Sequence, residues 1–136
     1  MASSKTHPHT DMPSEDDLGR LILAKHPTHR ELYIEAHRLV VESVPGVHYS
    51  VDLIDGAIGY GARQFGYDGW GMAALSPHQA WVSLVLFRGT ILDDPDALLE
   101  GTGALVRHVK LRSLEDLATR RASIRRLLEA AAVARS

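Results

Sequence analysis

Apolar side chains recur at two different spacings along this chain, and the spacing changes near the middle of the sequence. In the first part they recur every three or four positions, which predicts amphipathic helices over 14–25 and 28–44. Ser14, followed by three acidic residues, is a favourable start for the first helix. Thr28 and Glu31 have the spacing of a capping box, which predicts the start of the second helix.

The middle of the chain alternates between apolar and small or polar residues, with frequent glycine, and this pattern predicts strands. Tight turns join the first three of them into an antiparallel meander. The third is apolar on both faces, so we expect it to be an interior strand. A helical turn capped by Ser50 is expected over 50–56. The predicted strands lie near 57–65, 69–75, 79–88 and 104–112.

Helices are also predicted on either side of the last strand. Asp94 and Pro95 have the residue types of a helix start, which predicts a short helix over 94–100. Ser113 caps a final helix with an apolar side. Amphipathic helices bury their apolar side against a one-faced sheet, so the fold class is two-layer α+β, with an antiparallel β-sheet packed against N- and C-terminal helices. The polar residues 1–13 are expected to form a disordered tail to a single domain over 14–136.

Composition narrows the classes of protein to which the chain can belong. Its 136 residues are 45% hydrophobic and 24% charged, as in an ordinary soluble domain. No apolar run approaches the roughly 20 residues of a membrane span, and the first residues lack the apolar core of a secretory signal, so cytoplasmic residence is expected. The absence of cysteine excludes disulfides, a thiolate nucleophile and cysteine ligation of a metal.

Charge gives little support to nucleic-acid binding. The formal net charge is −2, although residues 104–136 hold 8 basic and 3 acidic side chains. On a helix the arginines of this segment point in directions spread around its circumference, and the segment has no aromatic residue to stack on bases. These arginines are Arg120, Arg121, Arg125 and Arg126.

Short motifs give the chain a family resemblance. They are Tyr60-Gly61, Ser83-Leu84 before Phe87-Arg88-Gly89, Asp94-Pro95, the run LLEGTG, and Arg107-His108-Val109. With these motifs the chain resembles, from about Thr28 to Ala131, the YdhG-like family of small bacterial domains. The resemblance implies an α+β fold often compared with that of frataxin. Some family members are described as frataxin-like iron chaperones, so iron is the cofactor or cargo that the resemblance implies.

Two glutamates are the candidate metal ligands. Glu31 and Glu35 lie one helical turn apart and present an i,i+4 pair of carboxylates, and a hard cation such as iron prefers oxygen ligands. The alternative is an ordinary solvated helix face, because neighbouring acids pair with Arg38 at helical spacing. Histidines add no ligand set, since His29 and His37 are two turns apart.

An arginine on an apolar strand face marks the second candidate site. Strand alternation places Arg107 on the side of Val109 and Leu111, towards the helices. A buried guanidinium needs a carboxylate such as Asp94 or Glu100, an escape to water, or an anionic ligand in a cleft, and the sequence leaves these open. In the ligand hypothesis further residues complete a cleft for a small anionic or aromatic ligand. These are His108, Lys110, Tyr60, Trp70 and Trp81.

No catalytic set is assigned. The run GWGMAA fits a dinucleotide-binding pattern in letters only, because a proline follows where a helix must begin. The serines lack a nucleophile-elbow motif. Three functions remain as hypotheses: a non-enzymatic domain that binds a small ligand or anion, an iron chaperone acting through Glu31 and Glu35, and a protein-interaction module that forms a homodimer.

Overall fold

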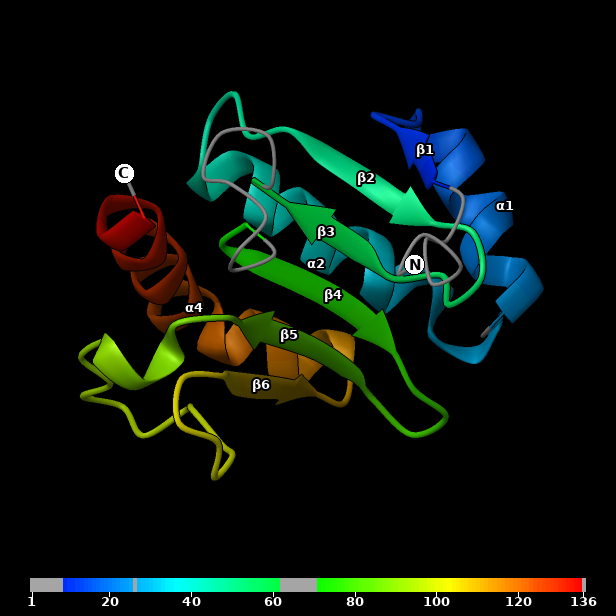
Figure 1. The fold of residues 1–136 in the computed structure, drawn as a ribbon. Coiled ribbons are helices and arrows are strands. Elements are labelled where there is room, and N and C mark those ends of the chain that lie inside the picture. Colours follow the sequence, from blue (N-terminus) through cyan, green and yellow to red (C-terminus); the bar gives the residue numbers. More distant parts are fainter. Residues whose placement is uncertain (1–8, 26, 62–70, 136) are drawn as a thin grey trace.

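The computed structural model describes residues 9–25, 27–61 and 71–135 of the chain (Figure 1). Within these ranges, six strands form one antiparallel sheet in which each strand pairs with the next along the chain. The fold is therefore α+β, as the sequence predicts. The strands are β1 (His9–Asp11), β2 (Tyr49–Asp52), β3 (Ile58–Tyr60), β4 (Ala73–Pro77), β5 (Val82–Leu86) and β6 (Arg107–Leu111).

Helices cover one side of this sheet. Figure 1 shows α2 and α4 behind the strands, with α1 beside α2 near the β1 end. The α-helices in the described residues are α1 (Glu15–Lys25), α2 (Arg30–Ser43) and α4 (Leu114–Arg135), and the short 3-10 helices are η2 (Pro27–His29) and η3 (Gly89–Ile91).

The core fills the space between the helices and the inner face of the sheet. Alternate residues of β5 show this arrangement, since Leu84 is 1% exposed whereas its neighbour Val85 is half-buried on the other face. Buried residues of α2 and α4, among them Leu39 and Ile124, meet the inner face of β4, β5 and β6. Apolar side chains are therefore buried mainly on the face that the helices cover. Among the described residues, no α-helix packs on the other face (Figure 1).

The predicted helix caps at Ser14 and Ser113 are confirmed, whereas the capping box predicted at Thr28 is wrong. The hydroxyl of Ser14 accepts the Asp17 N–H at 3.2 Å, and that of Ser113 accepts the Asp116 N–H at 3.0 Å. The capping box at Thr28 does not form, because residues 27–29 make a 3-10 turn and α2 begins only at Arg30, with no side chain capping it.

Each of the four predicted strand regions contains a strand, but residues 9–11 and 50–56 differ from the prediction. Residues 9–11, expected in a disordered tail, pair with β2 as an edge strand. The helical turn expected over 50–56 is wrong, because Val51 is fully buried opposite Ile58 in the sheet. Asp52 then accepts the Ile54 N–H at 2.8 Å, which closes the turn into β3.

The helix predicted over 94–100 is also absent from the structure. The Asp94 carboxylate accepts the N–H groups of Leu98 and Leu99 at 2.9 and 2.8 Å, so it closes a loop instead of capping a first helical turn. Ala97 has a left-handed φ of 55°, which no α-helix accommodates. Glu100 then exchanges two main-chain hydrogen bonds with His108 and extends the edge of the sheet.

Candidate functional site

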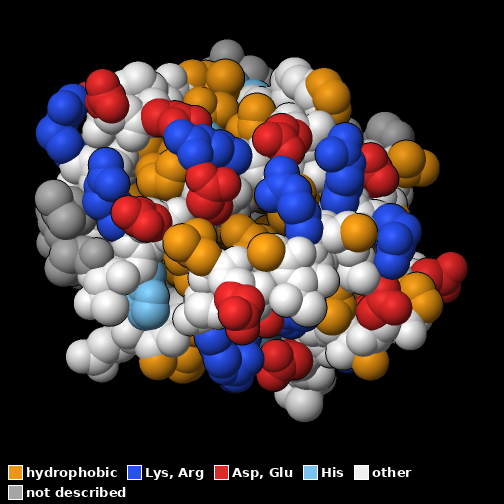
Figure 2. Space-filling view, turned by 180° about the vertical axis from the view of Figure 1, so that it is seen from behind, with side chains coloured by type: hydrophobic (Ala, Val, Ile, Leu, Met, Phe, Trp, Pro, Cys, Tyr) orange, Lys and Arg blue, Asp and Glu red, His pale blue; other side chains and the backbone are white. Residues whose placement is uncertain are grey.

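A pocket of about 620 Å³ opens on the helix side of the molecule, between α1, α2 and α4. Figure 2 shows this side, where acidic and basic side chains alternate around patches of hydrophobic surface. The apolar part of the lining is Ile34, Leu114, Leu117 and Ala118. The charged part is Glu15, Asp16, Glu31, Glu35, Arg30, Arg38 and Arg121.

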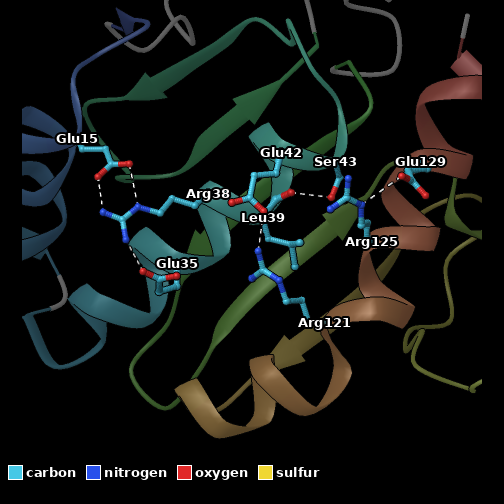
Figure 3. Close-up of polar contacts among 9 residues, drawn as sticks. All are labelled: Glu15, Glu35, Arg38, Leu39, Glu42, Ser43, Arg121, Arg125 and Glu129. Carbon is cyan, nitrogen blue, oxygen red and sulfur yellow. Dashed lines mark hydrogen bonds and ion pairs between the residues drawn. The ribbon is translucent and has the colours of Figure 1, made fainter.

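Ion pairs between helices build the walls of this pocket (Figure 3). Arg38 of α2 binds Glu15 of α1 with both arms of its fork, through Nε at 2.9 Å and Nη2 at 2.6 Å, and it also pairs with Glu35. Arg121 of α4 donates to Glu42 of α2 at 2.6 Å. The three helices are thus linked across the pocket by charged hydrogen bonds of fixed geometry.

The pKa values of the paired groups agree with this picture. Hydrogen bonding from Arg38 holds the pKa of Glu15 below its ordinary value, and the same contact raises the pKa of Arg38. Both groups therefore stay ionised and paired at neutral pH.

Three charged groups of the lining remain available to a ligand. Within the described part of the chain, the side chains of Asp16, Arg30 and Glu31 take part in no hydrogen bond and no ion pair. Arg30 lies against α1, where a methyl group on Gly19 would come within 2.8 Å of its Nη2 atom. The absence of a side chain at Gly19 therefore makes room for this guanidinium.

A second pocket, of about 440 Å³, adjoins the first. Arg30, Glu31 and Leu114 line both pockets, so the two pockets are continuous at these residues and share two charged side chains. The second pocket adds Arg112, which follows β6, and Ser113, which caps α4. Thr28, His29 and Leu32 complete its lining.

Arg107 lies where strand alternation places it, but its guanidinium turns to the main chain. Nη1 donates to the carbonyl oxygens of Gly103 at 2.6 Å and Val106 at 2.8 Å. Its Cβ is so close to Gly89 that a methyl group there would approach within 2.4 Å. Asp94, one of the expected partners, uses its carboxylate on the loop N–H groups described above. The contacts of Arg107 are those of a side chain that holds the 103–106 loop.

Three other members of the predicted ligand set lie on the outer face of the sheet, and two of them, Lys110 and Trp81, are in contact. The ammonium of Lys110 lies 4.9 Å from the centre of the Trp81 ring, and His108 is two residues from Lys110 on the same face of β6. Trp81 is also stacked on His78, with ring centres 4.9 Å apart, and it donates to the Ser83 hydroxyl at 2.8 Å. Both the ring and its N–H are therefore already engaged within the protein.

Tyr60 is separated from that cluster by the sheet itself. It is fully buried on the inner face, where its hydroxyl and His37 Nδ1 share a hydrogen bond of 2.7 Å. Burial lowers the pKa of His37 to about 4, so this ring is neutral at neutral pH. Trp70 lies outside the described residues. The structure therefore divides the predicted set between two faces and does not assemble one cleft from it.

Glu31 and Glu35, the candidate metal ligands, line the helix-side pocket. Glu35 is paired with Arg38, whereas Glu31 is unpaired among the described residues. Over that part of the chain, no three acidic or histidine side chains come together closely enough to hold a metal ion.

Sequence reasoning missed Arg30 and Arg112, which lie 82 positions apart and meet at one pocket only through the placement of α2 and β6. A signal was present at Gly19, a glycine inside an amphipathic helix, which indicates a close approach by another group.

Comparisons with known proteins add no assignment. No family model, no curated protein and no solved structure matches this chain. None of the helices in the described ranges combines the length and apolar character required to cross a bilayer.

Proposed function

We propose that this protein binds a small organic ligand in the pocket between α1, α2 and α4, and that it does so without catalysing a reaction. The observation that carries the proposal is the combination of an apolar floor with three unpaired charges on its rim, Asp16, Arg30 and Glu31. Binding pockets for small molecules have volumes of about 300–1,000 Å³, a mostly apolar lining and a few convergent polar groups. The helix-side pocket has the volume of such a site and an apolar floor, but its rim is more charged than is usual, which favours a ligand that carries a charge.

The fixed ion pairs support binding rather than chemistry. Arg38 and Arg121 are held by carboxylates and shape the walls without being free to move onto a substrate. The lining residues of this pocket that the structure describes include no serine, histidine or lysine, and the two unpaired carboxylates, Asp16 and Glu31, are exposed to water. The unpaired charges on the rim are placed to orient a charged ligand over the apolar floor.

A pocket-filling variant tests this proposal. Ala118 lies on the pocket floor, and Ala118→Phe is expected to occupy the space of a ligand without changing the core. Ala122→Phe is the matched control, because Ala122 is exposed on the same helix outside the pocket lining. Two-dimensional NMR titrations with hexanol, hexanoate and hexylammonium are expected to shift amide signals around Ile34 and Leu114. These shifts should disappear in Ala118→Phe and persist in Ala122→Phe, and no shift with any probe would refute the proposal.

The second candidate ligand is ferrous iron, as the family resemblance implies. In its favour, four carboxylates line the same pocket: Glu15, Asp16, Glu31 and Glu35. Against it, two of them are held by Arg38. Anaerobic calorimetric titration with Fe(II) distinguishes the two candidates. Binding heat that disappears in Glu31→Gln would support iron as the ligand. No heat above that of the buffer would exclude iron.

A further inference from the structure

We infer that the ligand is an amphiphilic anion, a carboxylate or phosphate monoester with a short apolar tail, whose head group binds between Arg30 and Arg112. This inference rests on the proposed function and specifies the chemistry of its ligand. It places the tail over the apolar floor of the first pocket and the head in the adjoining second pocket, since the two pockets share Arg30 and Leu114.

The first argument is the pairing of the arginines. Six arginines of the described residues are paired with carboxylates: Arg20, Arg38, Arg120, Arg121, Arg125 and Arg126. Arg30 and Arg112 line one pocket, and in the described structure no carboxylate lies within ion-pair distance of either guanidinium. Among the described arginines, Arg88 and Arg107 also lack a carboxylate partner, but Arg107 is held by main-chain carbonyls and neither lines these two pockets. Arg30 and Arg112 are therefore the two guanidiniums without a carboxylate partner that face the same pocket.

The second argument is the glycine behind Arg30. Glycine inside a helix is destabilising relative to alanine, and Gly19 is a buried position of α1. A methyl group there would lie 2.8 Å from Nη2 and 3.2 Å from Nε of Arg30. The helix therefore carries a destabilising residue at the point where it leaves room for this guanidinium.

The third argument is the charge of the rim. The second pocket has two guanidiniums and the carboxylate of Glu31, so its fixed charges favour an anion. Arginine presents parallel N–H donors that match both carboxylate and phosphate oxygens. The adjoining floor of Ile34, Leu114 and Leu117 takes apolar surface from the same molecule out of water.

The experiment compares probes that share a tail and differ in the head group. Hexyl phosphate, hexanoate, hexanol and hexylammonium are titrated into the full chain and followed by NMR, and inorganic phosphate serves as a head without a tail. We expect the anions to bind at least about tenfold more tightly than hexanol, the effect of one charge-assisted hydrogen-bonded contact. The two anions show which head is preferred.

Variants at the head-group site provide the decisive comparison. Arg30→Gln and Arg112→Gln are each expected to lower the affinity for the anions roughly tenfold and to leave the affinity for hexanol unchanged. Arg20→Gln and Arg125→Gln are matched controls, since both arginines lie outside the two pockets. Gly19→Ala is expected to lower the affinity for the anions by displacing Arg30, while the chain still folds with an equal or higher melting temperature.

The outcomes separate this inference from the proposed function. Equal affinity of the anions and hexanol, or anion affinity that is unchanged in both Arg30→Gln and Arg112→Gln, overturns the inference but leaves a binding pocket that Ala118→Phe blocks. Failure of every probe to bind overturns both.

Discussion

The buried pair of His37 and Tyr60 shows how much one hydrogen bond contributes at the residue scale. Both residues are at most 4% exposed, and their side chains are 2.7 Å apart. Tyr60→Phe removes the hydroxyl and leaves Nδ1 of His37 without this partner inside the core. We expect a loss of about 1–3 kcal/mol in the free energy of unfolding, measured by urea denaturation at pH 7. Tyr49→Phe is the control, with an expected loss below about 1 kcal/mol, because its hydroxyl is only partly buried.

The same histidine makes stability depend on pH. Burial lowers the pKa of His37 to about 4, with Glu15 acting to raise it and Arg38 to lower it further. Between this value and the ordinary 6.5, the unfolded chain binds a proton that the folded chain does not. Stability should therefore fall as the pH is lowered through this range, by at most about 1.4 kcal/mol per pH unit from this group.

Denaturation midpoints at pH 6.5, 5.75 and 5 test this dependence. Three carboxylates also have lowered pKa values: Glu15, Asp96 and Asp116. Their contribution to stability is lost only as the pH falls below their ordinary pKa values, 4.5 for Glu15 and 3.8 for the two aspartates. The three pH values chosen therefore lie above the range in which these carboxylates titrate. His37→Gln keeps a hydrogen-bonding group next to Tyr60 but cannot titrate, so its slope should be flatter. An equal slope in the two proteins would assign the dependence to other groups.

At the scale of elements, a single carboxylate determines the path of the segment between β5 and β6. Asp94 binds the N–H groups of Leu98 and Leu99, and Ala97 lies in the left-handed region. We expect Asp94→Ala to increase hydrogen exchange at the Leu98 and Leu99 amides at least tenfold, since about 1.4 kcal/mol of local protection corresponds to that factor. Asp94→Asn retains one hydrogen-bond acceptor, so its exchange rates at these amides should lie between those of the unchanged protein and those of Asp94→Ala. Unchanged exchange in Asp94→Ala would show that other contacts hold this loop.

Elements with a continuous periodic pattern were predictable, and those set by one side chain were not. The helices at 14–25 and from Ser113 follow from spacing and caps, since a helix needs only local hydrogen bonds and an apolar side. Residues 94–100 have the composition of a helix start, yet the side chain of Asp94 bonds further along the chain. Strand β2 is only Tyr49–Asp52, too short for alternation to outweigh the cap signal at Ser50.

At the scale of the molecule, the sequence predicts the layers but not the pockets. Alternation in β6 correctly places Arg107 on the side of Val109 and Leu111, because a strand repeats every two residues. The direction of its guanidinium depends on the carbonyls of the 103–106 loop, which no periodicity predicts. The pocket shared by Arg30 and Arg112 depends on how α2 packs beside the end of β6, a long-range arrangement.

The one-sided core gives a final prediction for the molecule as a whole. Leu84 and Val85 are neighbours in β5, an interior strand, but Leu84 faces the helices and Val85 faces away from them. Leu84→Ala leaves a cavity in the core and should cost about 2–5 kcal/mol of unfolding free energy, whereas Val85→Ala should cost less than about 1 kcal/mol. Urea denaturation measures both. Equal losses would mean that the outer face of the sheet is also covered, and light scattering on the same samples would then show whether a second copy of the chain covers it.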